Sequence, residues 1–168
     1  MNNKNRKELQ KIFPFTNPAK IGLKNSFGFG DRIGLANPGH LRALGKLKFA
    51  PVLAQQSIRE LTRTGRSADD VMDAAVWAVF QEGYTKGFSA DADHLKTTDD
   101  IDMLVKAGFI MFTFDPGGFV NNEADNLSVS ELKGVLESYP WNELNDSLED
   151  AKKRYLKKAI ILLIIFIG

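Results

Sequence analysis

Short apolar runs that alternate with amphipathic stretches constrain the fold of this 168-residue chain more than any other feature. The apolar runs, each followed by glycine or polar residues, predict short strands, and the apolar positions at helical spacing between them predict helices. Regular alternation of strand and helix is typical of βα units joined into a parallel sheet. We therefore expect an α/β fold, either an open doubly wound sheet or a closed barrel.

The clearest expected helix covers residues 67–81. Ser67 and Asp70 form a variant of the capping box, and Val71, Ala75 and Val79 lie on one apolar stripe. Expected strands cover 26–30, 49–54, 87–93 and 109–114, and further helices are expected over 38–46 with Asn37 as N-cap, from Thr98 to Gly108, and from Ser130 to Pro140.

Charge and composition exclude several classes of function. Lys and Arg number 22 and Asp and Glu 21, so no overall basic field exists for binding nucleic acid. The chain contains no cysteine, which excludes disulfides, thiolate zinc sites, iron–sulfur clusters and cysteine nucleophiles. This composition is compatible with a reducing compartment, and we expect a cytoplasmic protein without a nucleic-acid or membrane partner.

The two ends of the chain differ from the rest. Residues 1–11 are polar and basic and do not form a secretory signal. Residues 159–167 are an unbroken apolar run, too short to span a bilayer, whose isoleucines favour a buried strand. An abnormal end caused by truncation or a frameshift, and a tail on a membrane surface, are the alternatives. The expected organisation is an extension over 1–25, an α/β domain over 26–156 and an apolar segment over 157–168.

Polar residues that directly follow an expected strand mark where a ligand could bind, because ligands bind beyond the carboxyl ends of parallel strands. Three clusters have this position: 28–32, 91–94 and 115–118.

The cluster with the most specific chemistry contains Asp91, Asp93 and His94. Alternation along a strand puts Asp91 and Asp93 on one face, and His94 joins them if the chain turns at the strand end. Two carboxylates and an imidazole could hold a divalent cation and a proton-transferring base. The alternative is a polar turn that caps the next helix, with His94 on the surface.

The other two clusters allow a structural and a functional interpretation. The segment 28–32 lacks the glycine spacing of a dinucleotide site and the Lys-Ser/Thr of a P-loop. It is either a tight turn or the place where Arg32 pairs with a substrate carboxylate. Asp115 precedes Pro116, which favours a structural role in a turn. It is also a minor candidate for the functional site, because it follows a strand.

Four motifs in order resemble the amino-terminal part of the tagaturonate epimerase family. They are 26–32 (SFGFGDR), 36–40 (ANPGH), 91–95 (DADHL) and 112–115 (FTFD), and the resemblance covers about 26–122. It implies a (β/α) barrel of TIM type, present here as about four to five βα units and therefore incomplete. It also implies an isomerase that uses a divalent metal cation, of unassigned identity, to interconvert D-tagaturonate and D-fructuronate.

The resemblance also implies roles for single residues. His94 would be a metal ligand, and Asp93 would abstract a proton next to a carbonyl. Asp31, Arg32 and Asp91 would be substrate-binding residues, with Asp91 also an alternate base and Asp31 and Arg32 also structural supports.

Family members are longer than this chain and take further metal ligands from later strands, whereas no histidine follows His94 here. Three interpretations stay open: an epimerase completed by further sequence or by assembly of half-barrels, an inactive truncated remnant, and a small α/β module that binds an anion. The small-molecule partner of the first is a sugar acid. Open strand edges would favour self-association.

Overall fold

The computed structural model describes residues 3–31, 34–45 and 47–156. Arg32 and the apolar run 159–167 lie outside the described residues. The chain divides into two compact units, Met1–Gly118 and Phe119–Gly168. The division falls inside the expected 26–156 domain, and the expected extension 1–25 belongs to the first unit.

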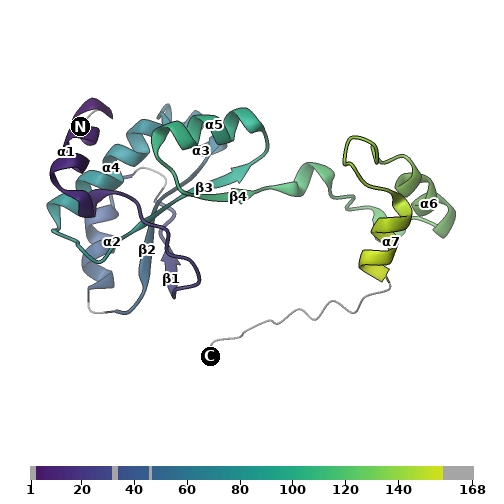
Figure 1. Ribbon diagram of the computed structural model, residues 1–168, viewed down its shortest axis with the longest axis horizontal. Coiled ribbons are helices and arrows are strands. Elements are labelled where there is room, and N and C mark those ends of the chain that lie inside the picture. The colour runs from purple at the N-terminus through teal and green to yellow at the C-terminus, as the bar shows by residue number, and fades with distance from the viewer. Residues whose placement is uncertain (1–2, 32–33, 46, 157–168) are drawn as a thin grey trace. The chain divides into compact units, whose positions relative to one another are not determined.

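The first unit is a half-barrel built on a parallel sheet with strand order β1-β2-β3-β4 (Figure 1). The strands are β1 (Ser26–Gly28), β2 (Ala50–Ser57), β3 (Ser89–Leu95) and β4 (Met111–Phe114). All four expected strands are confirmed. β2 continues three residues beyond its expected end at Ala54.

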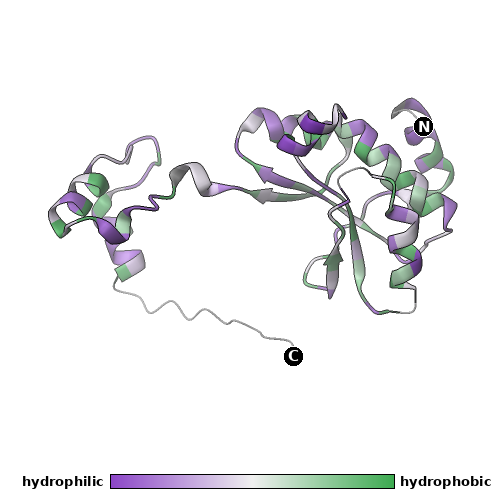
Figure 2. Cartoon of the chain, turned by 180° about the vertical axis from the view of Figure 1, so that it is seen from behind, coloured by the Kyte–Doolittle hydropathy of each residue, from purple (hydrophilic) through white to green (hydrophobic). Residues whose placement is uncertain are grey.

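Helices cover one face of this sheet (Figure 1). They enclose a core in which Leu53, Ala90, Ala92 and Leu95 from the strands, and Phe88 just before β3, pack against apolar side chains of the helices. Each helix in Figure 2 carries hydrophobic and hydrophilic residues, as a helix with one buried face should. The helices are α1 (Asn3–Ile12), α2 (Asn37–Leu44), α3 (Ile58–Thr64), α4 (Ala68–Gln81) and α5 (Thr98–Ala107), with a short 3-10 helix, η1 (Pro14–Thr16).

Capping boxes mark the starts of α3, α4 and α5. Ser67 and Asp70 cap α4 as predicted. The predicted cap of α5 at Thr98 is wrong by one residue, because Thr97 has the acidic Asp100 three positions later and forms the reciprocal pair of bonds.

Two further predicted helix starts are also wrong. Asn37 lies inside α2, whose N-cap is Ala36 without a side-chain bond. Ser128 rather than Ser130 begins the helix after β4, because its side chain pairs with Glu131 at the third helical position.

Helix α1 is fixed to α4 by a buried arginine. Arg6, only 2% exposed, pairs through Nη1 with Asp73 Oδ1 at 2.9 Å and through Nη2 with Asp69 Oδ1 at 2.7 Å. Burial raises the pKa of Asp73, and the charge of Arg6 opposes that rise. Residues 3–12 are thus a packed part of the first unit.

The second unit contains short helices, and none of its described side chains is buried. Its helices are η3 (Ala124–Asn126), α6 (Val129–Glu137) and α7 (Leu148–Leu156), and η2 (Pro116–Phe119) follows β4. Within the part of the chain that is described, no helix has the length and apolarity to cross a membrane.

Candidate functional site

Strand β3 presents two carboxylates on the face opposite the helices. Phe88, Ala90 and Ala92 point into the core, so the alternate positions Asp91 and Asp93 lie on the other face, as their spacing predicted. Asp91 is 1% exposed and Asp93 is half-buried.

A bulge then directs His94 away from the core. The pairing of β3 with β4 shifts between Ala92 and Leu95, and His94 adopts a left-handed backbone with φ of 55°. The extra residue moves Leu95 into the core position that His94 would otherwise occupy. The imidazole is therefore 56% exposed, at the last residue but one of β3.

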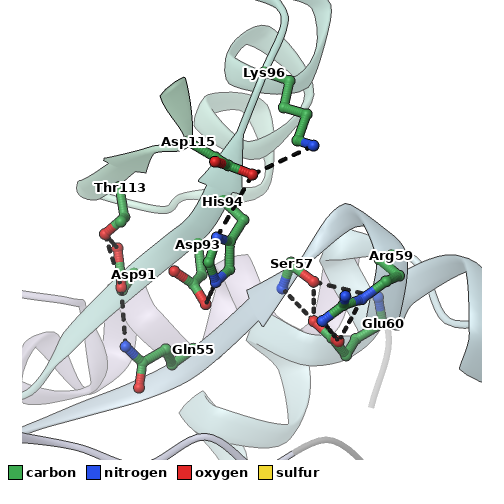
Figure 3. Close-up of polar contacts among 10 residues, drawn as sticks. All are labelled: Gln55, Ser57, Arg59, Glu60, Asp91, Asp93, His94, Lys96, Thr113 and Asp115. Atoms are coloured by element: carbon green, nitrogen blue, oxygen red, sulfur yellow. Dashed lines mark hydrogen bonds and ion pairs between the residues drawn. The ribbon is translucent and has the colours of Figure 1, made fainter. Parts of the chain in front are cut away.

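The imidazole of His94 lies between two carboxylates (Figure 3). Its Nε2 is 3.5 Å from Asp93 Oδ2, and its Nδ1 is 3.9 Å from Asp115 Oδ2. Asp115 accepts a 2.8 Å hydrogen bond from the backbone N–H of Gly117 and lies 3.3 Å from Lys96 Nζ. These two contacts, the backbone bond first, lower the pKa of Asp115. The structure thus brings the minor candidate Asp115 into one cluster with Asp93 and His94.

Asp91 is held by neutral donors from both neighbouring strands. Gln55 Nε2 on β2 donates to Oδ2 at 3.1 Å, and Thr113 Oγ1 on β4 lies 3.0 Å from Oδ1. Burial raises the pKa of Asp91, the charge of Asp93 adds to the rise, and the two hydrogen bonds oppose it. This carboxyl therefore retains its proton to higher pH than an ordinary aspartate does.

A second bulge places Gln55 beside Asp91. Ala54 has φ of 56°, and the pairing of β2 with β3 shifts between Leu53 and Gln56. Without the extra residue, alternation would direct Gln55 toward the helices.

A cavity of about 520 Å³ opens beyond the carboxyl ends of β2 and β3, next to His94. This volume is in the usual range for small-molecule sites. It is lined by Ile58 and by the polar or charged residues Ser57, Arg59, Thr62, His94, Lys96, Thr97, Asp100 and Asp115. A cavity of about 870 Å³ lies among α3, α4 and α5 and contains none of the predicted site residues.

Arg59 is oriented at the start of α3. The Ser57 side chain caps this helix by accepting from the backbone N–H of Glu60, and the Glu60 side chain accepts in return from the Ser57 N–H. Arg59 Nη2 lies 3.1 Å from Glu60 Oε1. The sequence analysis did not identify Gln55, Arg59, Lys96 or Thr113 as site residues, although Thr113 lies in the motif 112–115. The strand was expected to end at Ala54, so Gln55 and Arg59 were assigned to no element. The S-x-x-E spacing of Ser57 and Glu60 could have predicted α3.

Asp31 stabilises the loop after β1. Its carboxylate Oδ2 accepts from the Ala36 N–H at 2.6 Å, and its carbonyl oxygen accepts from Gln56 Nε2 at 2.6 Å. These bonds connect β1 with the start of α2 and with β2. The substrate-binding role expected of Asp31 stays a prediction, as does that of Arg32.

The described residues do not provide a complete set of metal ligands. Asp93 Oδ2 and His94 Nε2, 3.5 Å apart, could share one cation. Within residues 3–31, 34–45 and 47–156, however, no three His, Asp or Glu side chains are grouped to hold a metal ion. Two donors leave most of the coordination sphere of a divalent cation to other groups.

Comparison with known proteins identifies the family of this chain. The family described as tagaturonate epimerase matches residues 1–163, a longer stretch than the expected 26–122. A tagaturonate/fructuronate epimerase of Thermotoga maritima is 50% identical over 152 residues, which are 90% of this chain and 31% of that protein.

Crystal structures of a fructuronate-tagaturonate epimerase from Cohnella laeviribosi, native and with glycerol, superpose with a TM-score of 0.79 at 44% identity. They are matched over 94% of this chain and 31% of theirs, so the chain spans about a third of the length of its relatives. This chain belongs to the tagaturonate epimerase family.

Proposed function

We propose that this chain forms the proton-transferring part of an enzyme that interconverts D-tagaturonate and D-fructuronate. The observation that carries the proposal is the placement of Asp93 beside His94, at the carboxyl end of β3 and next to a cavity of suitable size. The substrates are those named for the Thermotoga and Cohnella relatives. A cytoplasmic location belongs to the same proposal and suits a chain without cysteine.

Asp93 is the proton acceptor in this proposal. An epimerase inverts one carbon of its substrate, and this inversion can proceed when a base removes a proton from the sugar acid and the proton later returns. Asp93 is half-buried, and its Oδ2 faces the imidazole of His94. Arg59 and Lys96 line the adjacent cavity, and their charges suit the carboxylate of a sugar acid.

The proposal includes a divalent cation that His94 binds through its imidazole. Because the described residues lack a third donor, its remaining ligands would come from other parts of the assembled enzyme. Proton transfer is assigned to Asp93 independently of the cation. Asp31 and Arg32 stay candidates for contact with the substrate.

A chimeric enzyme tests these roles. Residues 1–163 of this chain would replace the matching region of the Thermotoga epimerase, and epimerisation would be assayed with added Mn²⁺, Zn²⁺ or Mg²⁺. We expect an active chimera in which Asp93→Asn lowers kcat by at least about 100-fold, the usual contribution of a general base. Asp99→Asn, a change at an exposed aspartate in the first turn of α5, is the matched control.

An inactive chimera, or equal activity of the two variants, contradicts the proposal. The same assay in deuterium oxide identifies the proton. Deuterium on the inverted product indicates abstraction from carbon next to the carbonyl, and product without carbon-bound deuterium indicates that Asp93 acts on a hydroxyl group.

A further inference from the structure

We propose that Gln55 binds a hydroxyl group of the sugar acid, and that Gly28 and Asp91 act through Gln55 by fixing the orientation of its amide. The proposal rests on the proposed function and adds one residue to those that would contact the substrate. Gln55 lies outside the four sequence motifs.

The backbone of β2 is distorted next to Gln55. Ala54 has φ of 56°, a left-handed conformation that residues other than glycine rarely adopt. Residues in such conformations persist where the surrounding structure enforces them, and they cluster at ligand and active sites. The bulge at Ala54 turns Gln55 to the face opposite the helices, where its amide reaches Asp91.

Strand β1 leaves room for this amide because residue 28 is glycine. A methyl group at Gly28 would lie 2.6 Å from Oε1 of Gln55, a distance that side chains essentially never show. On its other side, the amide donates through Nε2 to Asp91 Oδ2 at 3.1 Å. The amide is therefore confined between β1 and β3, with its oxygen toward Gly28 and its nitrogen toward Asp91.

Asp91 orients this amide rather than touching the substrate itself. Its carboxyl also lies 3.0 Å from Thr113 Oγ1, so that Gln55, Asp91 and Thr113 form a row across β2, β3 and β4 (Figure 3). Asp91 is only 1% exposed, which leaves its carboxyl almost no surface for a ligand. Among the described residues the Gln55 amide makes this one hydrogen bond, and its second N–H and Oε1 can bind a ligand.

The position of Gln55 suits a sugar acid whose reacting carbon lies at Asp93. Gln55 lies beside Asp91, and Asp91 and Asp93 are two residues apart along β3, which corresponds to about 7 Å of strand. A six-carbon chain with bonds of about 1.5 Å has a similar length, so one sugar acid can contact both residues. A neutral amide offers a donor and an acceptor, which matches a hydroxyl group.

Binding of a hexonate, the sugar acid with its keto group reduced to a hydroxyl, tests the proposal without turnover. The protein is the chimera that carries residues 1–163 of this chain in the Thermotoga epimerase, and calorimetry measures the dissociation constant. We expect Gln55→Ala to raise the dissociation constant about tenfold, as expected for loss of one hydrogen bond. Gly28→Ala should raise it by a similar factor, because its methyl group displaces the amide. The double variant should bind no more weakly than Gln55→Ala alone.

Monodeoxy hexonates, each without one hydroxyl group, identify the contact. The native chimera should bind one of them about tenfold more weakly than the hexonate, whereas the Gln55→Ala chimera should bind that compound and the hexonate equally well. Gly39→Ala is the matched control, since it adds the same methyl group on α2 where no atom lies within 4 Å, and it should leave the dissociation constant unchanged. A urea melt of each variant verifies that it is folded.

Unchanged binding in Gln55→Ala or Gly28→Ala, additive losses in the double variant, or the same discrimination among monodeoxy compounds with and without Gln55 would each overturn the proposal. A chimera that binds no hexonate overturns it as well. Hexonate binding that depends on Gln55, in a chimera without epimerase activity, would support this proposal and contradict the proposed function alone.

Discussion

Asp91 combines burial with hydrogen bonds from neutral donors, and this predicts a dependence of stability on pH. Burial raises its pKa above the ordinary value of 3.8, so the folded chain binds this proton more tightly than the unfolded chain does. Its contribution to stability is therefore complete at pH below 3.8 and is lost as pH rises through the folded-state pKa. Asp91→Asn, which cannot titrate, should become more stable relative to the native chain as pH rises.

Urea unfolding of both proteins between about pH 3 and about pH 8 measures this difference. Asp115→Asn is a control for which we expect the opposite trend. Contacts lower the pKa of Asp115, so the native chain should become more stable relative to Asp115→Asn as pH rises. A difference between native chain and Asp91→Asn that does not change with pH would contradict the prediction.

The sequence predicted part of this site. Spacing placed Asp91 and Asp93 on one face of a strand, and His94 at its end. The partners Gln55 and Thr113 were not predictable, because they lie on neighbouring strands and reach Asp91 only through the pairing of the sheet.

At the scale of elements, the attachment of α1 to α4 depends on Arg6. Arg6→Ala should cost about 3–5 kcal/mol of unfolding free energy, because it leaves the buried carboxylate of Asp73 without its cation. Lys7→Ala, one position along the same helix and exposed, should cost less than about 0.5 kcal/mol. Urea melts of the two variants provide the measurement, and equal costs would show that the Arg6 pair does not fix α1.

These elements also show where sequence patterns stop being informative. Apolar runs revealed all four strands, and the Ser67–Asp70 pair revealed α4. Helix α1 is mostly polar, and a buried ion pair with α4 holds it in place, which no local pattern reports. The bulges at Ala54 and His94 need a left-handed backbone at residues that rarely adopt it, so sheet packing rather than propensity determines them.

At the scale of the whole molecule, the buried core belongs to the first of the two units. Every residue of the core cluster lies between Leu41 and Phe109, and no described side chain after Phe109 is buried. Since burial of apolar surface is the dominant favourable contribution to folding, residues after Gly118 should add little to the stability of the half-barrel.

Removal of residues 119–168 should therefore leave the free energy of unfolding of the half-barrel, measured by urea melts, within about 0.5 kcal/mol of that of the full chain, as expected for changes away from a core. The signal to follow is near-ultraviolet circular dichroism of Trp77, since Trp141 lies in the removed part. A truncation after Gly108, which removes β4 and the buried Phe109, is the contrasting variant and should abolish cooperative unfolding. Loss of cooperativity in the first variant would mean that the second unit contributes to the fold of the half-barrel, and would place part of its stability outside the core described above.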